Sequence, residues 1–337
     1  MNQNLLNTVG IDIIKKASQN RTGLSKTTEA YRLFNGFYEG CPGLVLDRYG
    51  SALVILDHGL PVDSEVTFQD LADWALSSGL GFESVLLKQR RAKDLTSRNG
   101  RLLAGIHLPH QIIEEGLPYA LDLQMNQDAG FYLDTRNLRR WLRKHAAGKK
   151  VLNTFAYTGS LGVAAGVGGA LEVIQTDLDQ KFLEFALKSW QLNELDSDRT
   201  RILPGDFFKI TDRLRRQARL FDIVILDPPF FSSTQAGRVD WQNQSTRLIN
   251  KVRPLVGHGG QLVVINNSLF LSGADFMAEL KTLCESEYLS LGEIIPIPED
   301  ITGYLDTIMD TPPVNPAPFN HPTKIAVLDV VRKDQRH

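Results

Sequence analysis

Polar and conformationally special residues follow several apolar runs in the second half of the chain. The first run, residues 151–155, overlaps the segment 153–159 (NTFAYTG). Gly159 lets the backbone turn sharply there, and the helical pattern that follows would begin with unpaired amide groups beside the turn. Such a turn can hold an anionic group of a ligand, although it also occurs as a purely structural connection. The spacing is not G-x-G-x-x-G, so a nicotinamide dinucleotide site and an oxidoreductase are poorly supported.

Carboxylates follow the next two apolar runs. Asp177 follows the run 171–176, where it could accept both hydroxyl groups of a ribose. Asp206 follows the short run 201–203, where it could accept from an adenine amino group while Phe207 packs on the ring. The structural alternatives are that Asp177 caps the next helix and that Asp206 is a turn acid. The glycine turn and the two acids, at the ends of three successive runs, together favour a nucleoside ligand.

A fourth run, 221–226 (FDIVIL), has the continuous apolar character of a strand that is buried on both faces. It leads directly into Asp227, Pro228, Pro229 and Phe230. The two prolines fix the backbone and remove two amide donors, which leaves carbonyl groups that can point into a site. Phe230 adds an aromatic face on which a planar base can stack. A rigid turn at the end of a strand is the structural alternative.

These runs need a regular α/β framework to position them. Helical patterns at 180–193 and 210–218 separate the runs, and further strands are expected at 261–265, 292–297 and 324–331. Strands that alternate with helices of this length predict a Rossmann-like, doubly wound and mostly parallel sheet. Ligands of such sheets bind at the carboxyl ends of the strands, where the residues described above lie.

The first part of the chain has a different pattern of apolar residues and glycines. Residues 1–29 predict an amphipathic helix and a polar tail, and residues 30–120 alternate short apolar runs with glycines. A chain of 337 residues exceeds the usual size of a single core. We therefore expect a small α+β domain at 30–120, a candidate for RNA contact, and a catalytic domain at 121–337.

The composition is that of an ordinary globular protein. The chain has 37 Lys and Arg against 39 Asp and Glu, a formal net charge of −2, and 42% hydrophobic residues. Two cysteines without a CxxC pair exclude a disulfide scaffold and a thiolate zinc cluster. No run approaches the roughly 20 apolar residues of a membrane span, and the N-terminus does not resemble a secretory signal. We expect a cytoplasmic protein without a metal.

Basic residues are bunched in two segments despite the slightly negative net charge. Residues 136–150 contain seven Lys or Arg and no acid, and residues 88–101 contain six, with Asp94 as the single acid. Such segments can neutralise a nucleic-acid backbone. They can equally be solvated helix faces or loops.

The order of these motifs, preceded by the segment 130–136 (GFYLDTR), resembles that of class I S-adenosylmethionine-dependent methyltransferases. More narrowly, it is similar to the bacterial large-subunit ribosomal RNA methyltransferases that include the 23S cytosine-C5 and guanine-N7 enzymes. The resemblance covers residues 120–331 and extends weakly to residues 38–50. It implies S-adenosylmethionine as the cofactor and RNA, in particular 23S rRNA or a large-subunit precursor, as the partner.

The resemblance also implies roles for individual residues. The segment 130–136 would lie over the cofactor, 153–159 would hold its methionine moiety, Asp177 its ribose, and Asp206 its adenine. The residues implied to bind S-adenosylmethionine are Phe131, Asp134, Arg136, Asn153, Phe155, Tyr157, Thr158, Gly159, Asp177, Leu178, Asp206, Phe207 and Asp227. The residues expected to face the methyl group and the target base, and so to be catalytic, are Asp227, Pro228, Pro229, Phe230 and Asn266.

The position after the fifth strand bears on the target atom. The cytosine-C5 enzymes carry a cysteine there, because carbon 5 becomes nucleophilic only after a thiolate adds at carbon 6. Here that position reads Asn266, Asn267 and Ser268, and neither Cys41 nor Cys284 is well placed. The asparagine pair looks closer to the guanine-N7 members. N7 of guanine already has a lone pair, so methyl transfer to it needs alignment of the reacting atoms rather than a thiolate or a strong base. We therefore favour guanine N7, or another base nitrogen, over cytosine C5.

The residues leave two other functions open. One is a methyltransferase that acts on a small molecule or a protein side chain, and the other is a non-catalytic scaffold that binds RNA. A methyltransferase of small molecules or proteins would show no salt-dependent RNA binding, which separates it from an RNA methyltransferase. A scaffold would bind RNA but transfer no labelled methyl group from the cofactor.

A proline-rich connection at 311–322 precedes the last strand. Loops of this length are uncommon unless they are functional or disordered. In a sheet of this topology the loop would emerge on the ligand side, so we expect it to form part of the substrate wall with Phe319 and His321. A metal role for His321 is not expected, because no second ligand lies at a suitable spacing.

Overall fold

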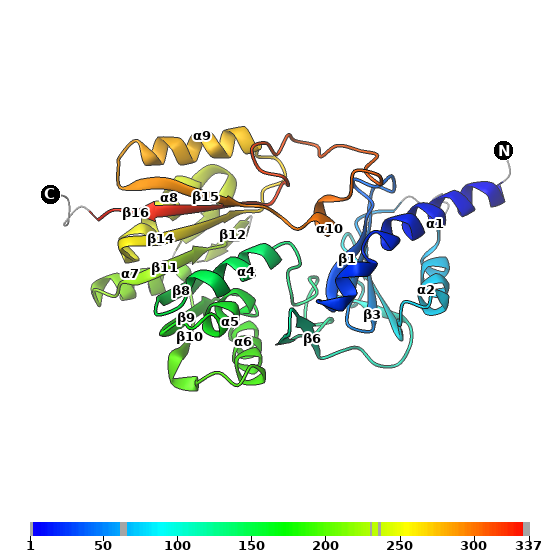
Figure 1. Ribbon diagram of the computed structural model, residues 1–337, viewed down its shortest axis with the longest axis horizontal. Helices are drawn as coiled ribbons and strands as arrows, with labels where there is room; N and C mark the ends of the chain where they lie inside the picture. Colours follow the sequence, from blue (N-terminus) through cyan, green and yellow to red (C-terminus); the bar gives the residue numbers. More distant parts are fainter. Residues whose placement is uncertain (1–2, 61–65, 230, 235–236, 333–337) are drawn as a thin grey trace. The chain divides into compact units, whose positions relative to one another are not determined.

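The computed structural model describes residues 3–60, 66–229, 231–234 and 237–332, and the side chains of residues 10–60, 66–229 and 245–332. The chain forms two units (Figure 1). The first comprises Met1–Leu133 and Pro298–Pro312, and the second comprises Asp134–Ile297 and Pro313–His337. The chain therefore enters each unit twice.

A five-stranded sheet forms the centre of the first unit, with its strands in the order β1-β2-β3-β4-β5. The pair β3 and β4 is parallel, because α2 (Phe68–Ser77) connects the two strands, and the other pairs are antiparallel. The strands are β1 (Ala30–Asn35), β2 (Leu44–Tyr49), β3 (Ala52–Asp57), β4 (Ser84–Gln89) and β5 (Arg101–Ala104).

Short helices and a hairpin complete the first unit around one apolar core. The start of α2 is fixed by a capping box, in which Thr67 and Asp70 each accept a hydrogen bond from the other's backbone amide. The core includes Ile14, Tyr31, Leu46, Leu71 and Val85. The other elements are α1 (Gln3–Gln19), η1 (Thr22–Lys26), α3 (Leu95–Asn99), β6 (Gln111–Glu114), β7 (Leu117–Ala120) and α10 (Glu299–Thr302).

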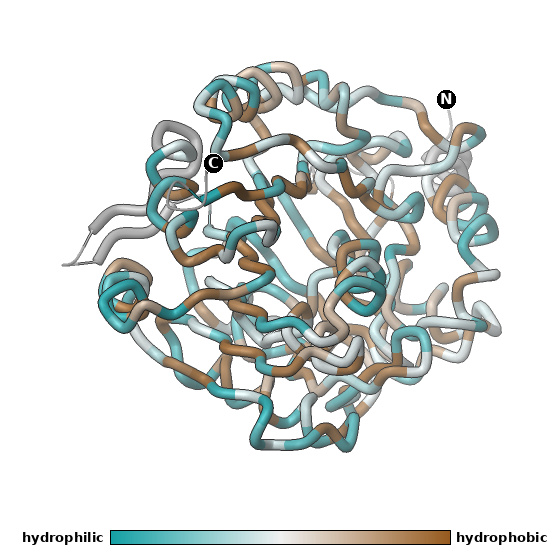
Figure 2. Tube along the Cα trace, turned by 60° about the vertical axis from the view of Figure 1, so that its left-hand side comes forward, coloured by the Kyte–Doolittle hydropathy of each residue, from teal (hydrophilic) through white to brown (hydrophobic). Residues whose placement is uncertain are grey.

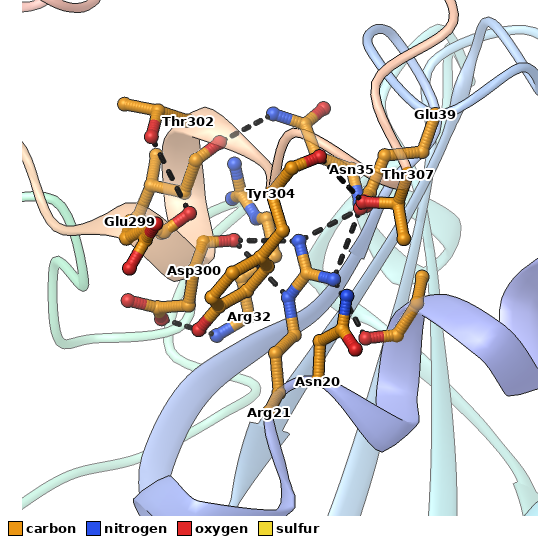
Figure 3. A network of polar contacts seen from close by, with 12 residues as sticks. Asn20, Arg21, Arg32, Asn35, Glu39, Glu299, Asp300, Thr302, Tyr304 and Thr307 are labelled. Carbon is orange, nitrogen blue, oxygen red and sulfur yellow. Dashed lines mark hydrogen bonds and ion pairs between the residues drawn. The ribbon is translucent and has the colours of Figure 1, made fainter.

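A buried ion pair fastens the segment 298–312 into the first unit (Figure 3). The guanidinium of Arg21 donates to both carboxylate oxygens of Glu39 at 3.0 Å, and both side chains are fully buried. Arg21 also donates to the carbonyl of Asp300, and the hydroxyl of Thr307 donates to Glu39 Oε1 at 2.5 Å. Because Asp300 and Thr307 satisfy groups of this pair, a segment from late in the chain completes the first unit.

A seven-stranded sheet forms the second unit, in the order β10-β9-β8-β11-β14-β16-β15. The first five strands in this order pair in parallel, and β16 is antiparallel to both of its neighbours. The mostly parallel, Rossmann-like sheet predicted from the sequence is thus confirmed. The strands are β8 (Lys150–Thr154), β9 (Glu172–Asp177), β10 (Thr200–Pro204), β11 (Phe221–Leu226), β14 (Val256–Asn266), β15 (Leu289–Ile295) and β16 (Lys324–Val330).

Helices pack on this sheet, and hydrophobic and hydrophilic residues are interspersed along the chain (Figure 2). Their apolar sides join the strands in a core that includes Leu226, Leu262 and Phe276. No helix in the described part of the chain is both long and apolar enough to cross a membrane. The elements are α4 (Arg136–His145), α5 (Ser160–Val167), α6 (Gln180–Leu192), η2 (Ser197–Arg199), α7 (Phe207–Arg216), β12 (Phe231–Thr234), β13 (Gly237–Asp240), α8 (Trp241–Val252), η3 (Arg253–Leu255) and α9 (Gly273–Cys284).

The division of the chain differs from the boundary expected at residue 120. Residues 121–133 belong to the first unit, where the amine of Lys88 donates to the carbonyl groups of Asn126 and Asp128. Residues 298–312 belong to it through the buried ion pair. Both sets of contacts join residues that are far apart in the chain. A boundary predicted from changes in the local sequence pattern cannot take such contacts into account.

Candidate active site

The carboxyl ends of the parallel strands bring candidate residues to one edge of the second unit. The strands β8, β9 and β14 end at Thr154, Asp177 and Asn266, and the order of the strands reverses between β8 and β11. Ligands of doubly wound sheets bind at this reversal. The candidate residues that the strand ends place along this edge are Asn153, Phe155, Tyr157, Thr158, Gly159, Asp177, Leu178, Asp206, Phe207, Asp227 and Asn266.

The loop between β8 and α5 has a strained backbone. Phe155 and Tyr157 have φ angles of 55° and 52°, and Gly159 has a φ of 77°. Non-glycine residues in this left-handed region cost on the order of 1–3 kcal/mol each, and such residues cluster at ligand sites. A Cβ atom at position 159 would lie 2.2 Å from the Cβ of Ala186, so only glycine fits. Gly159 caps α5 without a side chain, which leaves the start of the helix suited to an anionic group.

Asp177 organises this loop from the end of β9. Its Oδ2 accepts from the amide of Tyr157 at 2.8 Å, and its Oδ1 accepts from the amide of Asp179 at 3.2 Å. Burial raises the pKa of the Asp177 carboxyl, and the amide donors oppose that shift. Asp179 caps α6, so the capping role considered for Asp177 is already filled. A carboxylate has about four acceptor positions, so the amides of Tyr157, Leu178 and Asp179 still leave room for a ribose hydroxyl.

Asp206 is the N-cap of α7. Its Oδ1 accepts from the amides of Phe208 and Lys209 at 2.9 and 3.1 Å. The next residue, Phe207, stacks on Phe155 with ring centroids 4.6 Å apart and planes at 28°. This pair of rings joins the strained loop after β8 to the start of α7 and forms an apolar wall between them.

Two carboxyl groups of the second unit interact at the end of β11. Asp227 is half-buried, and burial together with the negative charge of Asp134 raises the pKa of its carboxyl to about 8. Asp134 accepts from the hydroxyl of Thr323 at 3.0 Å, a contact between residues that are far apart in the sequence. At pH 7 the Asp227 carboxyl is mostly protonated, so it can donate a hydrogen bond to an acceptor atom.

A buried polar cluster lies at the end of β14, where Asn266 pairs in register with Lys324. Asn266 is fully buried, and its Oδ1 accepts from the amide of Ser268 at 2.9 Å. Its Nδ2 has no hydrogen-bond partner among the described residues. Lys324 donates to the carbonyl groups of Ser268 and Pro322, and burial lowers the pKa of its amine to about 8. A buried donor without an acceptor costs about 1–3 kcal/mol, which makes Asn266 Nδ2 a candidate donor to a ligand.

The second unit offers no thiolate at this edge. Cys284 is the last residue of α9, a helix of 12 residues that leads the chain away from the end of β14. Such a helix is about 18 Å long, so Cys284 lies toward the opposite edge of the sheet. Cys41 belongs to the first unit, between β1 and β2, and the sequence has no third cysteine.

The predicted site residues differ in how far their side chains are buried. Asn153 is 1% exposed and donates to Gln175 Oε1 at 3.4 Å. Phe131 is buried in the first unit, where its ring lies 4.9 Å from that of Tyr119. Arg136 is 2% exposed at the start of α4. Thr158 and Pro228 are buried, Leu178 and Pro229 are exposed, and Phe230 lies outside the described residues.

Several cations of the two basic segments are unavailable to a nucleic acid. Lys88 is fully buried and donates to three backbone carbonyl groups at 2.7, 2.7 and 3.1 Å. Arg90 pairs with Asp128 at 2.7 Å, and Arg136 and Arg139 are buried in α4. The exposed cations that these segments retain include Arg91, Lys93, Arg140 and Lys144.

The structure places Phe319 in the core rather than in a substrate wall. Its side chain is 5% exposed, and its ring centroid lies 5.7 Å from that of Phe276 in α9. His321 is half-buried, and its Nδ1 accepts from the amide of Thr323. Nowhere in the described residues do three or more His, Cys, Asp or Glu side chains gather as a metal site would require.

Comparison with known proteins identifies the family. A family model described as S-adenosylmethionine-dependent methyltransferase matches residues 67–304, which are most of the chain. The chain belongs to this family. S-adenosylmethionine is therefore its cofactor, as the resemblance implied, and its residues fit the cofactor: the strained loop precedes an uncapped helix start, and Asp177 retains room for hydroxyl donors.

Relatives of this methyltransferase include proteins named for ribosomal RNA. Ribosomal RNA large subunit methyltransferase I of Aeromonas hydrophila is 35% identical over 229 residues, which are 66% of this chain and 57% of that protein. YwbD of Bacillus subtilis is 30% identical over 299 residues, which are 86% of this chain and 73% of that protein. Its name assigns it provisionally as a ribosomal RNA large subunit methyltransferase. The methyltransferase thus spans just over half of the Aeromonas relative.

Solved structures share the fold of this methyltransferase. A structure described provisionally as a methyltransferase, in complex with SAH, has a TM-score of 0.82 at 22% identity and covers 96% of this chain and 82% of its own. A provisionally assigned SAM-dependent methyltransferase from Streptococcus mutans has a TM-score of 0.80 at 23% identity, with 96% and 81% covered. At this level of identity the likeness concerns the fold alone.

Proposed function

We propose that this methyltransferase transfers a methyl group from S-adenosylmethionine to a base nitrogen of large-subunit ribosomal RNA, with guanine N7 favoured over cytosine C5. The choice of a nitrogen rests on the end of β14, where Asn266 stands at the position that a thiolate would occupy in a C5 enzyme. The choice of RNA is supported by the names of the relatives. A substrate of this kind implies a cytoplasmic location.

In this proposal the cofactor contacts are a subset of those that the sequence predicted. The loop 155–159 and the start of α5 would bind the methionine moiety, because the helix start favours its carboxylate. Asp177 would accept from the ribose hydroxyls, beside the exposed apolar side chain of Leu178. Asp206 and Phe207 would meet the adenine, close to the ring of Phe155.

Bound S-adenosylmethionine supplies an electrophilic methyl group on a positively charged sulfur. Guanine N7 needs no base to activate it, so the protein has to align the nitrogen with the methyl carbon and exclude water. The backbone carbonyl groups at 227–229 and the ring of Phe230 would hold the base. The protonated Asp227 carboxyl can donate to guanine O6, the acceptor that neighbours N7 at the same edge of the base.

The test is a methyl-transfer assay followed by mapping of the product. The protein is incubated with methyl-tritiated cofactor and with rRNA from a strain that lacks the gene, and the modified nucleotide is located by mass spectrometry. We expect label in one guanine of the large-subunit RNA. A labelled cytosine C5 would contradict the choice of atom, and label only in protein or small molecules would contradict the choice of RNA. RNA binding without any transfer of label would favour the scaffold.

A further inference from the structure

The outer face of α7 carries an exposed set of cations that neither basic segment includes. Lys209, Arg213, Arg215 and Arg216 are all exposed, and Lys209, Arg213 and Arg216 follow the i, i+4, i+7 spacing of one helical stripe. We call these four residues the α7 stripe. The helix contains one acid, Asp212, whose carboxylate accepts from the amine of Lys251 at 2.7 Å. The acid is thus already engaged by a cation of α8.

Stabilisation of the helix does not account for the whole stripe. Three of its cations, at 213, 215 and 216, lie in the last turn, where each is worth about 0.3–1 kcal/mol through the helix dipole. Lys209 lies in the first turn, where the same dipole disfavours a positive charge. The formal net charge of the chain is −2, so this local excess of cations is not a general property of its surface.

The neighbouring helix extends the positive surface. Arg247 of α8 is exposed, and its guanidinium carbon lies 5.5 Å from the ring centroid of Phe208, the second residue of α7. The amine of Lys251 lies 5.9 Å from the same ring. Phe208 is 7% exposed, so a packed aromatic ring holds these two cations next to α7.

We propose that the α7 stripe binds the phosphate backbone of the RNA substrate. The proposal rests on the proposed function, because it takes RNA as the partner. Guanidinium groups can bind phosphate through two parallel hydrogen bonds, which suits Arg213 and Arg216 to this role. Asp206, at the carboxyl edge of the sheet, is the N-cap of α7, and the 10 residues of the helix extend about 15 Å. Lys209, in the first turn, therefore lies nearest the candidate active site, and Arg213 and Arg216, in the last turn, lie farther along the surface of the second unit, where they would meet RNA that extends beyond the target base.

The test compares two double variants that lose the same charge. R213Q/R216Q removes two cations of the stripe, and K181Q/K188Q removes two exposed cations of α6 as the matched control. Binding to an in vitro transcript of large-subunit rRNA is titrated at several salt concentrations. Each phosphate contact in single-stranded RNA contributes about 0.7 to the slope of log K against log salt, so we expect the slope to fall by about 1.4 for R213Q/R216Q and little for the control.

Two further measurements keep the outcomes distinct. Cofactor affinity of R213Q/R216Q should stay unchanged, because both side chains are exposed, and any loss of thermal stability should be small, because only two helix-dipole interactions are removed. R213K/R216K should restore the slope because it restores the charge. If R213Q/R216Q binds RNA with the slope of the unaltered protein, or if the control loses as much, the assignment of the stripe is overturned. If the unaltered protein neither binds nor methylates RNA, the proposed function itself fails.

Discussion

The buried pair of Arg21 and Glu39 should be among the most sensitive points of the first unit. Glu39→Gln keeps the shape of the side chain but places an NH2 group where one carboxylate oxygen stands. If the NH2 group replaces Oε2, it faces the guanidinium of Arg21 and the amide of Asn35; if it replaces Oε1, it faces Arg21 and the hydroxyl of Thr307, which can accept from it. In either orientation the variant removes the negative charge beside a fully buried guanidinium and turns at least one hydrogen bond into a donor-to-donor contact.

The magnitude follows from the burial of both partners. Breaking a buried ion pair by removing one charge costs about 3–5 kcal/mol, because the remaining charge is left uncompensated. Native-state hydrogen exchange of the β1 amides measures the free energy of opening of the first unit. We expect that free energy to fall by about 3–5 kcal/mol in Glu39→Gln, or to the limit that the unit's own stability sets.

A surface pair in the same unit is the control. Asp12 and Lys15 are 3.2 Å apart, with side chains that are 58% and 49% exposed, so Asp12→Asn should cost at most about 1 kcal/mol. The double variant R21M/E39M should be much closer to the unaltered protein than Glu39→Gln, because apolar side chains replace both charges together. A loss below about 1 kcal/mol in Glu39→Gln would refute the reasoning that this pair holds the segment 298–312 in place.

Further predictions concern the candidate site and the basic segments. Asp177→Ala should raise the cofactor Kd at least tenfold by calorimetry with little loss of fold, because at least one charged hydrogen bond of about 1.5–3 kcal/mol is lost; an unchanged Kd would count against the ribose contact. Asp227 keeps its proton in the folded state up to pH 8 and loses it near pH 4 in the unfolded state, so its contribution to stability falls as the pH rises from 4 to 8; Asp227→Asn should flatten the dependence of Tm on pH in that window. The double variant C41S/C284S should retain methyl transfer in the tritium assay, and loss of activity in a folded protein would restore the covalent route. Lys88→Met should leave the salt dependence of RNA binding unchanged, since its buried amine cannot reach a phosphate; a smaller slope would show that it can.

Much of the candidate site was predictable from the sequence because its residues follow strands directly. A parallel strand of Val, Ile and Leu is visible as an apolar run, and the next residue then lies at the carboxyl edge whatever the packing around it. Asp177 and Asp227 were predicted in this way, and so was the turn at Gly159. The mostly parallel, doubly wound character of the sheet also followed, since helical connections between strands allow few topologies, whereas the order of the strands came from the structure.

Contacts between distant parts of the chain were not visible in the sequence. The basic segments gave no indication that Lys88 would donate hydrogen bonds to three backbone carbonyl groups, or that Arg136 and Arg139 would be buried. The pairing of Asp134 with Thr323, and of Asn266 with Lys324, joins residues that are far apart in the sequence. Local spacing carries no information about such partners, because they are chosen by the packing of whole elements.

The sequence by itself therefore determined the fold of the second unit, the edge of the sheet that carries the candidate site, and the family. Only the tertiary structure decided which charged side chains face solvent and which are buried with partners inside the protein. It buried Phe319 in the core, left the α7 stripe exposed and returned residues 298–312 to the first unit. The physical reason is that apolar periodicity is a local property of the chain, whereas the burial of a charge depends on partners that lie up to 279 residues away, as Asp300 lies from Arg21.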